Sequence, residues 1–126
     1  MKNRFKQNIF RGQHHGCWVE GYHVYCPHSG HHEIVSQNTA RSLTEVGVDP
    51  KTIGQFVREI KGMRIFEGDV VKTRHQEKAT VEWMEEYDCF VTRTIDEIVK
   101  DEIQFNLGDI QKILGNVTDN PKLLES

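Results

Sequence analysis

The feature that most constrains the fold is the ten-residue segment 62–71, which reads Gly-Met-Arg-Ile-Phe-Glu-Gly-Asp-Val-Val. Gly62 and Gly68 can adopt positive φ angles, so each can reverse the backbone within a turn. The β-branched pair Val70-Val71 then favours the start of a strand. The segment matches no catalytic signature. We therefore predict that it lies at the centre of a β-rich domain built from short strands.

Composition narrows the class of protein. The chain has 126 residues, the usual size of one domain, and a chain of this length can bury about two-thirds of its unfolded surface. We predict a single domain over residues 1–126. The 16 basic and 19 acidic residues give a net charge of -3, which argues against binding nucleic acid or anionic membranes through bulk charge. The net charge does not exclude a local patch of basic residues on the surface.

Two further features bear on cellular location. No apolar run approaches the roughly 20 residues of a membrane span, and the basic N-terminus is not followed by the apolar core of a signal peptide. Cys17, Cys26 and Cys89 are an odd number of cysteines without the spacing of a disulfide framework, which fits a reducing compartment. We therefore expect a cytoplasmic protein with no membrane partner.

The N-terminal part of the chain predicts a β-hairpin. Residues 17–25 are rich in aromatic and β-branched side chains, which favour a strand. The proline and glycine of segment 27–30 indicate a tight turn, so residues 33–36 can return as the antiparallel partner. A first strand is expected at residues 8–10. The pattern weakens over residues 37–48, where we expect a loop.

Turn and strand signals alternate along the rest of the chain. The Asp49-Pro50 step predicts a turn, because the residue before a proline is kept out of the helical region. Thr94 and Glu97 can form a capping box, which predicts a short helix over residues 95–102. Short strands are predicted at 52–57, 64–66, 69–73, 79–83, 89–92 and 111–117.

These elements together predict a mainly β fold. Its main part, over about residues 64–117, is a small bent-sheet or SH3-like barrel, with the N-terminal β-hairpin packed on it and with short helical segments. The predicted core consists of Trp18, Val19, Tyr22, Phe66, Val70, Val81, Trp83, Phe90, Ile113 and Leu114.

Five motifs in chain order resemble the YopX family of phage and prophage proteins. They are FRG at 10–12, WVEGY at 18–22, VDPKTIGQF at 48–56, IFEGDVV at 65–71 and LGNVTDNPKLL at 114–124. Each motif is weak alone, but the ordered set is specific and covers nearly the whole chain. Residues 58–62 are shorter than the family's usual turn at this place and lack its leading glycine. The resemblance implies a mostly β fold and a phage or prophage protein in a bacterial host cell, and it transfers no activity or catalytic residue.

Histidine and cysteine residues crowd the predicted hairpin, and both are usual ligands of zinc. The best candidate ligands are His28, His31 and His32, around the turn. Against a metal site, Cys17 and Cys26 fall on opposite faces of their strand, whereas a tetrahedral site needs converging ligands. We therefore expect surface imidazoles beside a hairpin, with no bound metal or cofactor.

The candidate catalytic groups have structural explanations. Glu67 and Asp69 flank a glycine, so a pair of carboxylates for acid-base or magnesium chemistry is conceivable. An aspartate after a glycine, however, commonly caps its own turn through a side-chain oxygen. Cys89 lies within a strand pattern, where a cysteine is more often a small apolar residue than a nucleophile. We predict that the chain is not an enzyme.

Two functional classes remain, a protein-interaction module and a nucleic-acid-binding small β-barrel. The basic residues that nucleic acid would use are Arg58, Lys61, Arg64, Lys72, Arg74 and Lys78. Acidic residues, such as Glu67 and Glu77, are interleaved with them and dilute a continuous positive field. We therefore favour a non-catalytic accessory protein that binds a protein partner or itself through open strand edges, as a homo-oligomer.

Overall fold

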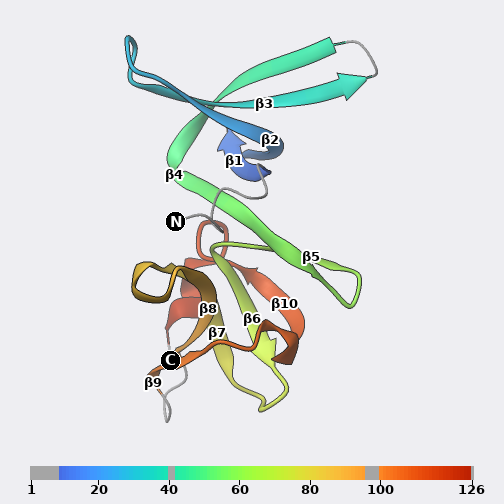
Figure 1. Cartoon of the computed structure of the whole chain (residues 1–126), viewed down its shortest axis with the longest axis vertical. Helices are drawn as coiled ribbons and strands as arrows, with labels where there is room; N and C mark the ends of the chain where they lie inside the picture. Colours follow the sequence, from blue (N-terminus) through green and yellow to red (C-terminus); the bar gives the residue numbers. More distant parts are fainter. Residues whose placement is uncertain (1–8, 40–41, 96–99, 126) are drawn as a thin grey trace. The chain divides into compact units, whose positions relative to one another are not determined.

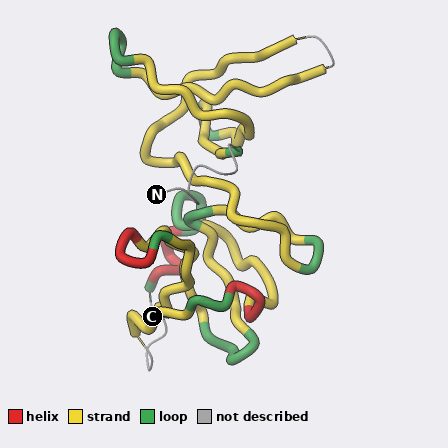
Figure 2. The backbone as a smooth tube through the Cα atoms, in the orientation of Figure 1, coloured by secondary structure: helices red, strands yellow, loops and turns green. Residues whose placement is uncertain are grey.

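The fold is mainly β. A computed structural model describes residues 9–39, 42–95 and 100–125 of the chain. Strands account for most of the described residues and form antiparallel sheets, and helix occurs in the described residues only as short 3-10 turns (Figures 1 and 2). The chain divides into two compact units, an N-terminal unit that ends at Phe56 and a C-terminal unit that begins at Val57.

The structure contains ten strands and three 3-10 turns in its described part. In chain order they are β1 (Phe10–His14), β2 (Cys17–Cys26), β3 (His31–Thr39), β4 (Ser42–Ile60), β5 (Met63–Phe66), β6 (Asp69–Thr73), β7 (Lys78–Met84), η1 (Glu85–Tyr87), β8 (Cys89–Ile95), β9 (Lys100–Gln104), η2 (Leu107–Asp109), β10 (Ile110–Asn116) and η3 (Pro121–Leu124). No described helix is long and apolar enough to cross a bilayer.

The strands of the N-terminal unit pair in a ring, in which each of β1 to β4 pairs with two of the others. β1 pairs with the first half of β2, and the second half of β2 pairs with β3. β3 pairs with β4, and β4 returns to pair with β1, so that Gln55 lies opposite Phe10. The hairpin predicted from the sequence is confirmed as β2 and β3. β1 and β4 complete the ring, because β1 pairs with β2, β4 pairs with β3, and β1 and β4 pair with each other.

The loop predicted at residues 37–48 is wrong within the described residues, because 37–39 belong to β3 and 42–48 to β4, while 40 and 41 lie outside the described part. The turn predicted at Asp49-Pro50 is also wrong, because β4 runs through it as one strand. Pro50, which has no N–H to donate, lies in a β-bulge. In this bulge the residues between Asp49 and Gly54 face the single residue Gly12 of β1. Turn chemistry is still present, since the Thr52 hydroxyl donates to the Asp49 carbonyl at 2.6 Å. It bends the strand without ending it.

Burial in the N-terminal unit follows the two faces of the hairpin. Ile34 and Val48 are buried, and a Cβ at Gly12 would lie 3.2 Å from the Val48 side chain, so the strands approach closely there. The predicted core position of Tyr22 is wrong, because 56% of this residue is exposed. Its neighbour His23 pairs with Ile34 and points to the buried side, and successive residues of a strand point to opposite faces.

The C-terminal unit contains a second sheet with the strand order β10-β6-β7-β8-β9. The end of β4 and β5 form a hairpin over it, whose turn residues Lys61 and Gly62 both have positive φ angles, 52° and 81°. Two positive φ angles characterise the two-residue turn that matches the twist of a hairpin. The reversal predicted at Gly62 is therefore confirmed. The buried cluster of this unit consists of Ile60, Ile65, Val71, Ala79, Val81, Leu107 and Ile110.

Most of the predicted core residues of the C-terminal unit are buried or half-buried. Phe66, Val70 and Val81 are buried, and Trp83 and Phe90 contact each other edge to face with their ring centroids 5.0 Å apart. The exception is Ile113, which is 37% exposed, so its core assignment is wrong. It lies on the edge strand β10, where register shifts on both sides of it disturb the alternation.

The second sheet is bent and, within the described residues, is not closed by hydrogen bonds, because its strand order leaves β9 and β10 as edges (Figure 1). The short helix predicted over residues 95–102 is wrong where the structure can be compared. β8 continues to Ile95 and β9 begins at Lys100, while residues 96–99 lie outside the described part. The hydroxyl of Thr94 accepts the N–H of Glu102 at 2.9 Å and so links two strands instead of capping a helix.

Candidate functional site

The second half of β2, residues 22–26, is an exposed strand edge, named here the β2 edge. β3 pairs with one side of it, and no strand in the described ranges pairs with the other, since β1 reaches only as far as Gly21. Three large apolar residues are exposed along this short segment: Tyr22 at 56%, Val24 at 40% and Tyr25 at 53%. An open edge with apolar side chains is a template for pairing with another chain.

Other edges of the structure are protected by charge. β9 carries the exposed residues Asp101 and Glu102, and β10 carries the exposed Lys112. Charged side chains and irregular backbone discourage edge-to-edge pairing. The β2 edge reads Tyr-His-Val-Tyr-Cys and has no acidic, lysine or arginine side chain. It is therefore the strand edge best suited to bind another strand.

Aromatic and imidazole rings stack along one face of the same hairpin. Phe10 and His23 have ring centroids 5.4 Å apart, His23 and His32 stack at 5.1 Å with an interplanar angle of 12°, and Tyr25 lies 4.9 Å from His32. His23 Nε2 and His32 Nδ1 share a hydrogen bond of 2.8 Å, in which one imidazole donates and the other accepts. Burial, and secondly the neighbouring His32, lower the pKa of His23 below its usual value.

A hollow of about 730 Å³ lies beside this hairpin, lined by four histidines and by backbone of β4. The histidines are His14, His15, His31 and His32. His14 Nδ1 is hydrogen-bonded to the Gly47 carbonyl at 2.7 Å, so one ring is fixed in place.

The candidate metal ligands do not form one site. His31 and His32 both line the hollow, but His32 also belongs to the ring stack, and His28 is exposed at the turn and does not line the hollow. Across the part of the chain that the structure describes, no three side chains of the His, Cys, Asp or Glu type converge for a metal ion. All three cysteines are free thiols; Cys17 is exposed, and Cys26 and Cys89 are half-buried.

The carboxylate of Asp69 has a structural use. Its Oδ2 atom accepts the N–H of Phe66 at 2.8 Å, in a buried position. This bond is the turn cap that the sequence predicts for an aspartate after a glycine. Gly68 within the turn has a φ angle of 92°, and its N–H donates to the Val81 carbonyl at 2.9 Å. Asp69 therefore fixes the turn between β5 and β6.

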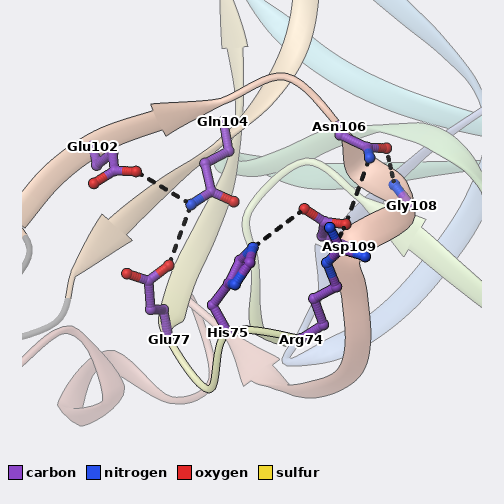
Figure 3. A network of polar contacts seen from close by, with 8 residues as sticks. All are labelled: Arg74, His75, Glu77, Glu102, Gln104, Asn106, Gly108 and Asp109. Carbon is purple, nitrogen blue, oxygen red and sulfur yellow. Dashed lines mark hydrogen bonds and ion pairs between the residues drawn. The ribbon is translucent and has the colours of Figure 1, made fainter.

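A second group of polar contacts joins the β6–β7 turn to β9 and η2 (Figure 3). Arg74 Nε lies 3.1 Å from Asp109 Oδ1, and His75 Nε2 lies 3.8 Å from Asp109 Oδ2. Gln104 Nε2 donates to Glu77 at 3.2 Å. Arg74 and His75 are largely exposed, so each contact contributes little to stability by itself. The group holds the turn in place.

Strand register brings together two of the six predicted basic residues and one that the sequence analysis missed. Lys72 of β6 lies opposite Lys78 of β7 on one side and opposite Lys112 of β10 on the other. We name these three residues the lysine row. Lys112 was missed because it lies far from Lys72 in sequence and only the register of β10 brings it there.

The other four predicted basic residues do not join the row. Arg74 pairs with Asp109, and the Arg64 guanidinium lies 5.7 Å from the centre of the Phe66 ring. Arg58 is on β4 and Lys61 is in the turn that follows. The predicted set therefore divides into three groups: two lysines of the row on the second sheet, three residues on the β4–β5 hairpin, and Arg74 in the β6–β7 turn.

Comparison with known proteins assigns the family. The family model described as YopX protein matches residues 18–125, which include the β2 edge and the lysine row. The FRG motif at 10–12 lies before the matched range. A search of curated proteins finds no match. Because the family model covers most of the 126 residues, this chain belongs to the YopX protein family.

Proposed function

We propose that this chain is a non-catalytic accessory protein of a phage or prophage, acting in the bacterial cytoplasm, that associates with a second copy of itself through the β2 edge. The observation that carries the proposal is the exposed, uncharged edge formed by residues 22–26. Complete burial of an exposed apolar side chain contributes about 1.5–3 kcal/mol, and Val24, which is 40% exposed, can gain part of this. Main-chain hydrogen bonds between two edges add to this and need no further side-chain match.

Two-fold symmetry gives the association a defined register. An antiparallel pair centred on Val24 places Val24 opposite its own copy and Tyr22 opposite Cys26 of the second chain. Tyr22, Val24 and Cys26 lie on one face of β2, because side chains of a strand alternate. The two copies would therefore bury a continuous apolar strip.

A non-catalytic role is supported by the structural use of one candidate carboxylate, Asp69, and of a further half-buried carboxylate, Asp109. Asp69 caps the β5–β6 turn, and Asp109 holds Arg74 and His75. Both carboxylates are engaged in contacts that order turns.

Light scattering over a wide range of protein concentration tests the association. The wild-type chain should form dimers, and Val24→Lys should shift the equilibrium to monomers, because a charge cannot be buried at the centre of the pair. Tyr87→Lys is the matched control, since Tyr87 is an exposed large apolar residue of the C-terminal unit, away from the β2 edge. It should leave the dimer unchanged. A wild-type chain that stays monomeric, or dimers that survive Val24→Lys, would overturn the proposal.

Cross-linking tests the register. In a background where Cys17, Cys26 and Cys89 are serine, Val24→Cys should form an interchain disulfide on mild oxidation. Opposed residues of an antiparallel pair have Cα atoms about 4.5–5.5 Å apart, within disulfide range. Tyr87→Cys in the same background should not cross-link. Equal cross-linking by both variants would show random collision and would contradict the central position of Val24.

A further inference from the structure

Three lysines in direct cross-strand register are an unusual arrangement for a sheet. Like charges that face each other across paired strands destabilise the pair. Here Lys72 has a lysine opposite it on both neighbouring strands, Lys78 and Lys112. Neutral residues at these places would give a more stable sheet. The arrangement therefore suits a negatively charged ligand that offsets the repulsion.

Two carboxylates near the lysine row accept hydrogen bonds from residues outside the row. Glu82, on the same face of β7 as Lys78, accepts from Arg93 Nε at 3.0 Å and from the Thr80 hydroxyl at 2.7 Å. Glu77 accepts from Gln104. In the described part of the chain, Lys72 and Lys112 form no ion pair. Within the described residues, no carboxylate forms an ion pair with a lysine of the row.

The three lysines are held in a line. Adjacent strands are about 4.8 Å apart, so the row extends over roughly 10 Å. Lys78 Nζ donates to the Glu125 carbonyl at 3.0 Å, which fixes one end, and Lys112 at the other end is exposed on the edge strand. Charges in a line fit an extended polyanion better than a single small ion, which needs converging donors.

We propose that the lysine row binds the phosphate backbone of a nucleic acid without reading its bases. One strand of a duplex carries a phosphate about every 3.4 Å along the axis, so about three phosphates span the length of the row. Lysine binds phosphate as a point charge, without the fixed bidentate geometry of arginine, which suits contact with a backbone of any sequence. The proposal is independent of self-association, because the row and the β2 edge belong to different units of the chain.

Fluorescence anisotropy with a short labelled DNA duplex of mixed sequence tests the proposal. Three phosphate contacts predict a slope of about −2.7 for log affinity against log salt, so affinity should fall about 40-fold between about 50 and 200 mM salt. Lys72→Gln should reduce the magnitude of the slope by about 0.9 and weaken binding equally on any sequence. Lys112→Gln should act in the same way. Lys51→Gln, which removes an exposed lysine of the N-terminal unit, should leave the slope unchanged.

A second measurement separates binding from folding. Because Lys72→Gln relieves the repulsion in the row, it should raise the midpoint of thermal unfolding while it weakens DNA binding. Lack of DNA binding by the wild-type chain at low salt would overturn the proposal, as would a slope unaffected by Lys72→Gln and Lys112→Gln. Displacement of DNA by polyglutamate as readily as by unlabelled duplex would identify the row as a site for acidic protein segments and would also overturn it.

Discussion

Replacing Asp69 by alanine tests whether the buried turn cap stabilises the C-terminal unit. Asp69 is 2% exposed, and its Oδ2 atom accepts the N–H of Phe66 at 2.8 Å. The alanine variant leaves this buried N–H without its acceptor. The backbone of Gly68 already has hydrogen-bond partners, because its N–H donates to the Val81 carbonyl and its carbonyl accepts from the Val117 N–H.

The expected loss follows from burial and charge. A buried donor left unsatisfied costs about 1–3 kcal/mol, and a hydrogen bond to a charged acceptor contributes about 1.5–3 kcal/mol. These figures describe overlapping effects, so we expect Asp69→Ala to lower the free energy of unfolding by about 2–3 kcal/mol. Asp69→Asn keeps an acceptor oxygen and loses only the charge. It should cost about 1 kcal/mol.

Asp49→Ala provides the matched control. Asp49 Oδ1 also accepts a backbone N–H, that of Lys51 at 3.1 Å, but at an exposed place where water can replace it. We expect a loss below about 0.5 kcal/mol, as for most surface substitutions.

Each unit contains its own tryptophan, which allows the two losses to be measured separately. Trp83 reports on the unit of Asp69, and Trp18 reports on the unit of Asp49. Urea unfolding followed by Trp83 fluorescence in a Trp18→Phe background gives the first value, and the reverse background gives the second. Equal losses for Asp69→Ala and Asp49→Ala, or a loss below about 0.5 kcal/mol for Asp69→Ala, would refute the reasoning.

Three further predictions use other contacts. The buried hydroxyl of Thr73 has no hydrogen-bond partner among the described residues, so Thr73→Val should raise the free energy of unfolding by about 1 kcal/mol in urea titrations. A Cβ at Gly115 would lie 2.9 Å from Leu123 Cδ1, so Gly115→Ala should cost about 1–3 kcal/mol and speed amide exchange in η3. The pKa of His23 is lowered in the folded chain, mainly by burial and secondly by His32, so the unfolded chain binds the proton more readily. The contribution of His23 to the free energy of unfolding should be complete above pH 6.5 and should decrease as the pH falls from 6.5 towards the folded pKa. A free energy of unfolding that does not change over this pH range, or a pH profile that His23→Phe leaves unchanged, would contradict this.

Local signals predicted the turns at Gly62 and Gly68 and most of the short strands. Gly62 and Gly68 adopt the positive φ angles expected of them, and the Val70-Val71 pair lies in a strand. These local signals did not predict the length of β4. Asp49-Pro50 reads locally as a turn, but pairing with β1 and β3 supplies backbone partners on both sides of it, and a bulge absorbs the proline. Tertiary pairing overrode a local preference.

The candidate surfaces were predictable to different degrees. An open, apolar strand edge was expected, but its place at residues 22–26 depends on where β1 stops pairing with β2. Lys72 and Lys78 flank a single turn, so their opposition is a local hairpin relation. The position of Lys112 depends on two register shifts in β10, which no period-two pattern contains. The histidines suggested a metal from composition alone, whereas strand register distributes them between a ring stack and a hollow.

The pairing of β1 with β4 also sets an order of events during synthesis. The hairpins β1–β2 and β2–β3 join neighbouring segments and can form as soon as they leave the ribosome. The second side of β1 stays open until Gln55 has emerged, because Gln55 is the partner of Phe10. At about 5–20 residues per second, this delay lasts roughly two to nine seconds. A pause in translation before Gln55 would prolong the exposure of the β1 edge and favour misassembly of nascent chains.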